Sequence, residues 1–163
     1  NAFEIPVLTL TNVKGFEATV AAEKGIAIAS AKLTYAFANA DVPKVNVITG
    51  EAYGSAYVSM NSKSLGADLV YAWPTASIGM MDSQLAAKIM YADEIAAASD
   101  VAATVSEKAA EYAKLQSSVE SAAARGYVDT IISAEDTRKY VIGAFEMLFT
   151  KREDRPAKKH GTV

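Results

Sequence analysis

The alternation of short apolar runs with longer Ala-rich segments is the feature that most constrains the fold. The short runs are rich in β-branched residues, as is typical of buried strands. They lie at Val7–Thr11, Lys44–Thr49, Asp68–Trp73, Ala76–Met81 and Val128–Ile132. Because helical segments separate them, the sequence predicts an α/β layered domain with right-handed crossovers rather than a helix bundle or a β-sandwich.

The Ala-rich and amphipathic segments predict the helices. We expect helices over Thr19–Asn39, Ser55–Ser62, Ser83–Tyr91, Val105–Ala124 and Ser133–Phe149. The first is apolar around most of its circumference, which predicts packing on two sides. The third is preceded by Asp82, a favourable N-cap. The stretch Glu94–Thr104 is compatible with helix or loop, and a turn is expected over Gly50–Gly54.

Composition excludes several classes of function. The chain has 163 residues, of which 51% are hydrophobic and 21% charged, which suits one globular domain. Its net charge is −3 without a basic surface, so nucleic-acid binding is not expected. It contains no cysteine, which excludes thiolate catalysis, disulfides and Cys-based zinc sites. A reducing, cytoplasmic location is therefore expected.

The ends of the chain suggest a piece of a larger protein. No apolar run reaches the roughly 20 residues of a membrane helix, so we expect no membrane insertion, and no secretory leader is recognisable. Asn1-Ala2 precedes the first strand without a cap or turn, and we interpret it as a cloning scar. We expect a domain over residues 1–150, a charged C-terminal tail over 151–163, and a missing N-terminal half.

Standard catalytic side chains are scarce. The single histidine, His160, lies in the charged tail, where a general base is seldom held against its substrate. Ser-His-Asp and His-metal arrangements are therefore not expected, and no metal site is predicted. Gly50–Ser55 is similar to a phosphate-binding loop only superficially, since its glycine spacing is short and Ser55 stands where lysine belongs. The nucleophile-elbow pattern also fails at Gly54-Ser55.

The turn at Gly54 offers a different chemistry. A helix entered through a glycine leaves its first amides without intrahelical acceptors, and the helix dipole adds to their pull on negative charge. Such donors stabilise an oxyanion that develops during reaction. The alternative is a common turn with Ser55 as an ordinary N-cap, and spacing alone favours this simpler interpretation.

The surrounding motifs resemble the carboxyltransferase subunits of biotin-dependent acyl-CoA carboxylases, of the propionyl-CoA carboxylase beta and methylmalonyl-CoA decarboxylase alpha type. The similar strings are Val47–Tyr57, Ser62-Lys63, Gly66–Asp68 and Tyr71–Ala76 in the centre, Ile5–Val7, Ala31–Leu33, Tyr35–Phe37 and Val42–Lys44 before it, and Ala124–Asp129, Thr137-Arg138 and Arg155-Pro156 after it. The resemblance covers nearly the whole chain. It implies the crotonase-like ββα superhelix (ClpP/crotonase type) and the carboxyl half of the subunit.

The resemblance also implies site residues and partners. Backbone amides of Ser55 and Ala56 would form the oxyanion hole, and Gly54, Ser55, Ala56 and Tyr57 would bind biotin. The biotin would be carried by a biotinyl carrier protein, and the second substrate would be an acyl-CoA. The active site would lie between this half and the N-terminal carboxyltransferase half of a second subunit, in a homo-oligomer.

Two positions depart from the usual family pattern. Ser55 stands where glycine is common, which matters only if the backbone there needs a positive φ. Val58 stands where propionyl-type members carry aspartate, and this position is expected to select the acyl chain. A crotonase-like hydratase or hydrolase and a non-catalytic assembly domain remain alternatives, as do both directions of carboxyl transfer. Tyr71 and Trp73 are expected in the core, and Lys63 is expected to be solvated.

Overall fold

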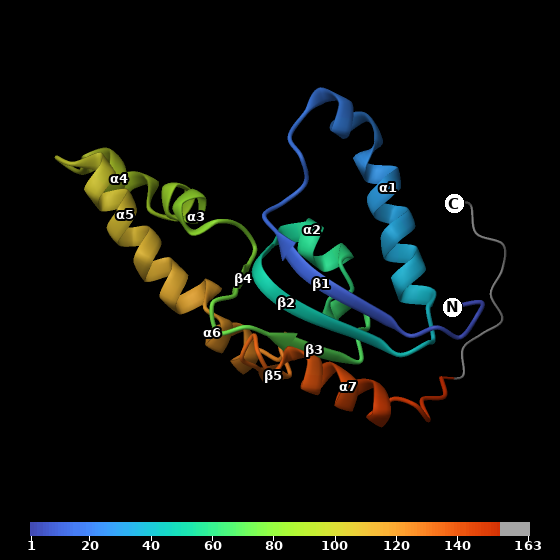
Figure 1. The fold of residues 1–163 in the computed structure, drawn as a ribbon. Helices are drawn as coiled ribbons and strands as arrows, with labels where there is room; N and C mark the ends of the chain where they lie inside the picture. Colours follow the sequence, from blue (N-terminus) through green and yellow to red (C-terminus); the bar gives the residue numbers. More distant parts are fainter. Residues whose placement is uncertain (154–163) are drawn as a thin grey trace.

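The computed structural model describes residues 1–153, which contain five strands in one parallel sheet (Figure 1). The strands are β1 (Val7–Val13), β2 (Lys44–Tyr53), β3 (Leu69–Ala72), β4 (Ser77–Gly79) and β5 (Thr130–Ile131). Their order is β1-β2-β3-β5, and β4 pairs with β2. All five predicted strands are therefore present, although β5 is shorter than expected.

Strand β2 is the centre of the sheet and has two different neighbours on one side. Its first half pairs with β3 from Val45 to Ile48, and its end pairs with β4 from Glu51 to Tyr53. The turn expected over Gly50–Gly54 is therefore wrong up to Tyr53, because pairing with β4 keeps the chain extended. The carboxamide of Asn12 fills the space beside Gly50 and accepts a hydrogen bond from the Glu51 amide at 3.0 Å.

Residues 1–153 form seven α-helices. They are α1 (Val20–Asn39), α2 (Gly54–Ser59), α3 (Ser83–Met90), α4 (Ala92–Ala97), α5 (Val101–Tyr112), α6 (Val119–Ala124) and α7 (Thr137–Met147). Asp82 caps α3 as predicted, since its carboxylate accepts hydrogen bonds from the Gln84 and Leu85 amides. The ambiguous stretch Glu94–Thr104 holds the end of α4 and the start of α5, which Asp100 caps. None of these helices is both long and apolar enough to cross a membrane.

The single helix predicted over Val105–Ala124 is wrong. Helix α5 ends at Tyr112, a π-helical turn covers Ala113–Ser117, and the chain becomes extended at Ser118 before α6 begins. Ser118 forms a backbone bridge with Ser77, the first residue of β4, and its hydroxyl accepts a hydrogen bond from the Ser121 amide. A contact with a distant segment thus interrupts a helix whose local pattern is continuous.

Helix α1 projects from the sheet, and the two-sided packing predicted for it is not seen within residues 1–153 (Figure 1). None of its residues is buried. Its contact with α2 is made by hydroxyls: Ser30 and Thr34 lie 3.1 Å and 3.3 Å from the Ser59 hydroxyl. Among its larger apolar side chains, Val20, Ile28, Leu33 and Tyr35 are exposed, whereas Ile26 and Phe37 are only partly covered.

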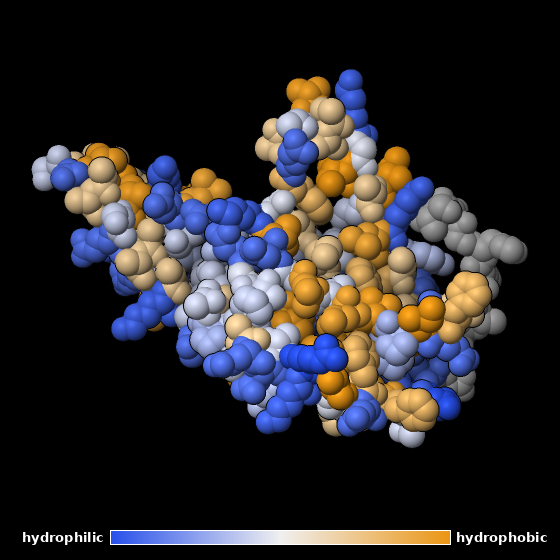
Figure 2. Space-filling view, viewed as in Figure 1, coloured by the Kyte–Doolittle hydropathy of each residue, from blue (hydrophilic) through white to orange (hydrophobic). Residues whose placement is uncertain are grey.

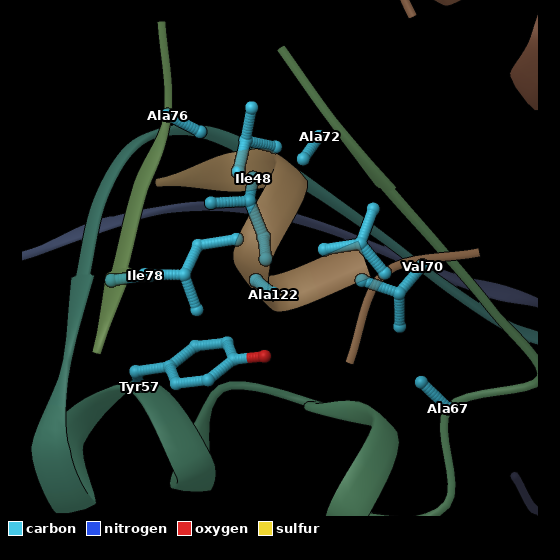
Figure 3. Packing of buried hydrophobic residues seen from close by; sticks show 11 residues of the cluster. Ile48, Tyr57, Ala67, Val70, Ala72, Ala76, Ile78 and Ala122 are labelled. Atoms are coloured by element: carbon cyan, nitrogen blue, oxygen red, sulfur yellow. The ribbon is translucent and has the colours of Figure 1, made fainter. Parts of the chain in front are cut away.

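Two apolar clusters pack on opposite faces of the sheet. One joins Ile48, Val70 and Ile78 with Tyr57 of α2 and with Val119 and Ala122 of α6 (Figure 3). The other joins Val45, Val47 and Tyr71 with Ile132 and with Ala144 of α7. Tyr71 thus lies in the core as expected. Trp73 packs at the edge of the second cluster, and its indole N–H donates to the Thr137 hydroxyl at 2.9 Å.

Charged side chains form hydrogen bonds and ion pairs at the ends of the strands. Lys63 was expected to be solvated, and this was wrong: its ammonium group lies 2.8 Å from both Asp129 oxygens and donates to the Asp68 carbonyl. Asp129 also accepts a hydrogen bond from the Val70 amide at 2.8 Å. The Asp68 carboxylate accepts from the Lys44 amide and pairs with Lys151 at 2.9 Å. These two carboxylates join β2, β3 and the approach to β5.

Candidate functional site

A pocket of about 500 Å³ lies between α1, α2 and the C-terminal end of α5. Its lining includes Ser30, Thr34 and Ser59, whose hydroxyls lie close together, and the apolar residues Ile78 and Met80. Gly54, Ser55, Tyr57 and Val58 lie along its rim and floor. Four of the five residues that the sequence singled out therefore meet at one pocket, of the size that proteins use for small ligands.

The backbone at Gly54 strongly favours glycine. Its φ angle is +61°, in the left-handed region that side chains rarely adopt. A Cβ atom at this position would also lie 3.0 Å from the carbonyl oxygen of Met80, just past the end of β4. The turn from β2 into α2 thus brings two backbone segments together at the mouth of the pocket.

Ser55 and Ala56 follow in the first turn of α2. Among the described non-glycine residues, only Glu4 and Asn61 have positive φ angles, so serine is accommodated at position 55 without strain. The first amides of α2 have no intrahelical acceptors, and no side chain caps this end of the helix. Ser55 is exposed at the pocket, whereas the Ala56 methyl is buried and does not line it.

Tyr57 anchors this turn in the core. Its ring extends from α2 beneath Ile78, and the residue is 7% exposed (Figure 3). Its hydroxyl is buried and has no hydrogen-bond partner within the described residues. Burial, together with the nearby Tyr127, raises the pKa of Tyr57 to about 12, so its phenol is neutral at physiological pH. Tyr57 therefore offers a packed ring and an uncharged hydroxyl rather than a base.

Arg125 is a functional candidate that sequence reasoning missed. It lines the pocket with Gln116 and Tyr127, and its guanidinium group donates to the Gln116 side chain and to the Leu115 carbonyl. It is the only ionisable side chain other than tyrosine among the described lining residues, so the lining contains no carboxylate. The string Ala124–Asp129 carries the family resemblance, but nothing local indicates that Arg125, at the end of α6, lines the same pocket as Gly54.

The remaining candidates lie elsewhere. Val58, four residues after Gly54, is half-exposed and lines the pocket. His160 falls outside the described residues, with the rest of the tail after Glu153. Within residues 1–153, no group of three His, Cys, Asp or Glu side chains could hold a metal ion.

Comparison with protein families identifies the family of the chain. The sequence pattern of the family described as carboxyl transferase domain matches residues 1–163. The chain belongs to this carboxyl transferase family. The recognition made from the motifs around Gly54 is confirmed.

Named relatives of this carboxyl transferase domain come from several bacteria. It is 48% identical over its whole length to the methylmalonyl-CoA decarboxylase subunit alpha of Propionigenium modestum, of which it covers 32%. It is 45% identical over 99% of its length to the methylmalonyl-CoA carboxyltransferase 12S subunit of Propionibacterium freudenreichii, of which it covers 31%. The chain therefore spans about a third of the length of these relatives.

Solved structures confirm the fold class. The crystal structure of a transcarboxylase 12S subunit, described as a hexamer with methylmalonyl-coenzyme A bound, matches with a TM-score of 0.92 and 45% identity. The match covers 98% of this carboxyl transferase domain and 31% of that chain. The beta subunit of a Pseudomonas aeruginosa geranyl-CoA carboxylase has the same fold, with a TM-score of 0.78. The expected α/β, crotonase-like fold is thus correct.

Proposed function

We propose that this chain is the biotin-facing half of an acyl-CoA carboxyltransferase active site. The observation that carries the proposal is the left-handed turn at Gly54, which opens directly onto the pocket. Biotin, when bound, supplies or receives the carboxyl group that is exchanged with an acyl-CoA. The pocket volume of about 500 Å³ and its mixture of hydroxyl and apolar walls suit a small bicyclic urea such as the ring system of biotin.

In this proposal the chain contributes backbone donors and shape. The amides of Ser55 and Ala56 donate hydrogen bonds to an oxygen on which negative charge develops, and one such donor typically contributes about 3 kcal/mol to lowering a barrier. Gly54 sets the direction of these amides, because its positive φ angle turns the chain from β2 into α2. Tyr57 fixes the turn through its buried ring, and Val58 is positioned to contact the acyl group.

The proposed partners follow from the family. A biotinyl carrier protein would deliver biotin, and the N-terminal half of a second subunit would supply the acyl-CoA side. Relatives are named both as carboxylases and as decarboxylases, so the site is proposed to handle carboxyl transfer in either direction. The substrate would be a short acyl-CoA of the propionyl, acetyl or methylmalonyl type.

The lining of the pocket argues against the hydratase alternative. A crotonase-like hydratase or hydrolase needs carboxylates to move protons beside the acyl group. The described lining residues include none, and Arg125 contributes a positive charge instead. Exchange of a carboxyl group with biotin does not require a protein carboxylate at this position, which agrees with the residues present.

Titration of the ¹⁵N-labelled chain with biotin and with a biotinylated carrier domain tests the proposal. We expect amide shift changes at Ser55, Ala56 and Tyr57, and their loss in Gly54→Ala. The matched control is Gly25→Ala, at a helical glycine with nothing within 4 Å of an added Cβ. Changes confined to Ser62 onward, with Gly54–Tyr57 silent, would contradict the biotin site and leave the assembly-domain alternative.

An activity assay tests whether the site is shared. The isolated chain should transfer no carboxyl group between carboxybiotin and propionyl-CoA or acetyl-CoA until the N-terminal half of a related subunit is added. Because acyl-CoA is proposed to bind largely on that half, its addition should restore both acyl-CoA binding and turnover. Full turnover by residues 1–163 alone would refute the shared site.

A further inference from the structure

Arg125 carries the only charge in the lining of the Gly54 pocket, as far as residues 1–153 describe it. It lies at the end of α6 and is exposed. The described lining contains no Asp, Glu or Lys, and none of the ion pairs within residues 1–153 includes Arg125. The pocket therefore presents a positive charge that no neighbouring carboxylate neutralises, and the proposed oxyanion donors do not account for it.

The guanidinium group of Arg125 is oriented by two acceptors from the turn that precedes α6. Its Nη2 atom donates to the Gln116 side-chain oxygen and, at 3.4 Å, to the Leu115 carbonyl. Both acceptors belong to the π-helical turn Ala113–Ser117, a form of helix that is often found at functional sites. The Leu115 carbonyl also accepts from the Ser121 hydroxyl at 2.9 Å, which links this turn to α6. The break between α5 and α6 thus sets the position of the cation.

The rest of the guanidinium group is open to a ligand. A guanidinium group has several N–H donors in a planar fork, and in Arg125 only Nη2 has acceptors within residues 1–153. The donors on Nε and Nη1 have none in this part of the chain, and Figure 2 shows a mainly hydrophilic surface where α5 leads into α6. Such a fork matches both oxygens of one carboxylate. Arg125 is therefore an oriented, solvent-accessible donor for an anion.

The composition of the lining favours a carboxylate over a phosphate. A phosphate group carries up to two negative charges and is commonly bound by several cations or backbone amides. The described lining offers one guanidinium group, together with hydroxyls such as those of Ser30, Thr34 and Ser59. One planar cation beside neutral donors matches the single charge and the flat shape of a carboxylate. The expected ligand group is therefore a carboxylate.

We propose that Arg125 binds the carboxylate of the group that is transferred, so that the pocket prefers the carboxylated form of its ligand. This inference rests on the proposed function, in which the group arrives on N-carboxybiotin or on a malonyl-type thioester. Both donors carry it as a carboxylate, whereas biotin and the uncarboxylated acyl group have no charge at that position. Arg125 is thus a specificity-determining residue that separates the carboxylated from the uncarboxylated ligand, and Gln116 is a positioning residue that acts through it.

Binding of a matched ligand pair to the 163-residue chain, measured by isothermal titration calorimetry, tests the role of the charge. The pair is freshly prepared N1-carboxybiotin amide and its neutral methyl ester, which have nearly the same shape. The amide blocks the valerate carboxylate of biotin, which would otherwise compete for Arg125. We expect the carboxylate to bind about tenfold more tightly than the ester, and Arg125→Gln to reduce this ratio to about one. Arg125→Lys, which keeps the charge but loses the planar fork, should give an intermediate ratio.

Two further variants separate recognition from stability. Gln116→Ala removes an acceptor that orients the guanidinium group, so it should lower the ratio about threefold and leave the affinity for the ester unchanged. A loss of affinity for both ligands by the same factor would contradict the positioning role. Arg138→Gln is the matched control, because it removes the same charge from an exposed position on α7 outside the pocket and should keep the wild-type ratio.

A second ligand pair identifies the source of the carboxylate. Methylmalonyl-pantetheine and propionyl-pantetheine differ by the same group. A preference that depends on Arg125 in this pair assigns the carboxylate to the thioester, and one in the biotin pair assigns it to carboxybiotin. A ratio near one for both pairs in the wild-type chain, or ratios that are unchanged in Arg125→Gln, would overturn the inference.

The inference and the proposed function fail separately. If biotin amide shifts the amides of Gly54–Tyr57 equally in the wild-type chain and in Arg125→Gln, but neither pair shows a preference, the biotin site stands and the role of Arg125 falls. If no biotin compound affects Gly54–Tyr57 while the thioester pair keeps a preference that depends on Arg125, the carboxylate site stands and the biotin-facing function falls.

Discussion

Gly54 lies so close to Met80 that an added Cβ atom would stand 3.0 Å from the Met80 carbonyl oxygen. The neighbouring atom belongs to a backbone rather than to a flexible side chain, so it cannot turn away. The φ angle of +61° at Gly54 adds a second reason for glycine. Position 54 therefore connects the geometry of the proposed site directly to the stability of the fold.

We predict that Gly54→Ala destabilises the chain by about 1–3 kcal/mol, from backbone strain together with the contact at Met80. Urea denaturation followed by circular dichroism measures the change. The same substitution at Gly25, inside α1 with open space around it, should stabilise by about 0.5–1 kcal/mol. Equal effects at the two positions would show that the left-handed turn is not the cause.

Tyr57→Phe should leave the stability at pH 7 unchanged or slightly higher. The Tyr57 hydroxyl is buried without a partner in the described structure, so its removal deletes an unsatisfied polar group and keeps the ring. Thermal unfolding compared with that of Tyr35→Phe, an exposed position on α1, provides the control. A clear loss of stability in Tyr57→Phe alone would mean that the hydroxyl has a partner such as a bound water.

The same variant should change the pH dependence of stability at alkaline pH. The pKa of Tyr57 is raised from 10.0 to about 12 in the folded chain, so the unfolded chain loses this proton first. The wild-type chain should therefore lose about 2 kcal/mol of stability between pH 10 and pH 12, a loss absent in Tyr57→Phe. Urea midpoints measured across this range test the difference, and parallel curves for the two proteins would contradict it.

Asp129→Asn should destabilise the chain by about 1 kcal/mol. The substitution weakens the charged hydrogen bonds from Lys63 and from the Val70 amide, which hold the approach to β5 against β3. The comparison is Glu51→Gln, which breaks the far more exposed pair with Lys14 and should stay within about 0.5 kcal/mol. Equal urea midpoints for the two variants would argue against a structural role for Asp129.

Ser118→Ala should cost about 1 kcal/mol, because the Ser118 hydroxyl caps α6 by accepting a hydrogen bond from the Ser121 amide. Ser118 also lies between Gln116, just before it, and Arg125, at the end of α6, both of which line the pocket. Chemical shifts around Arg125 should therefore change together with the unfolding free energy. Shifts confined to Ser121 would restrict the effect to the cap itself.

Sequence patterns predicted the strands, caps and turns that depend on neighbouring residues. The run Val45–Ile48 is a buried strand because three of its four residues are β-branched, and Asp82 caps α3 because its side chain accepts from the Gln84 and Leu85 amides. The turn into α2 was found from Gly54 for the same reason, since a glycine ahead of a short helix is a local signal.

What the sequence did not reveal depends on distant contacts. The break at Ser118 follows from its bridge to Ser77, and strand pairing beyond Gly50 follows from β4, neither of which leaves a local mark. Lys63 was taken as solvated because its partner, Asp129, lies far along the chain. Arg125 lines the pocket for a similar reason, since α6 brings it to a pocket that also contains Gly54, about 70 residues earlier in the chain.

Because the two halves of β2 pair with different strands, their backbone amides should exchange hydrogen at different rates. Amides from Val45 to Ile48 lie between β1 and β3 and should exchange their hydrogens only when the whole domain unfolds. The segment from Glu51 to Tyr53 is held by the three-residue strand β4, by a single register position with β1 (Ala52 with Val13) and by the Asn12 side chain at Glu51, so its amides should exchange through smaller, more frequent openings. The turn that carries Gly54 is joined to this faster end, and it can therefore adjust to a ligand without opening the centre of the sheet.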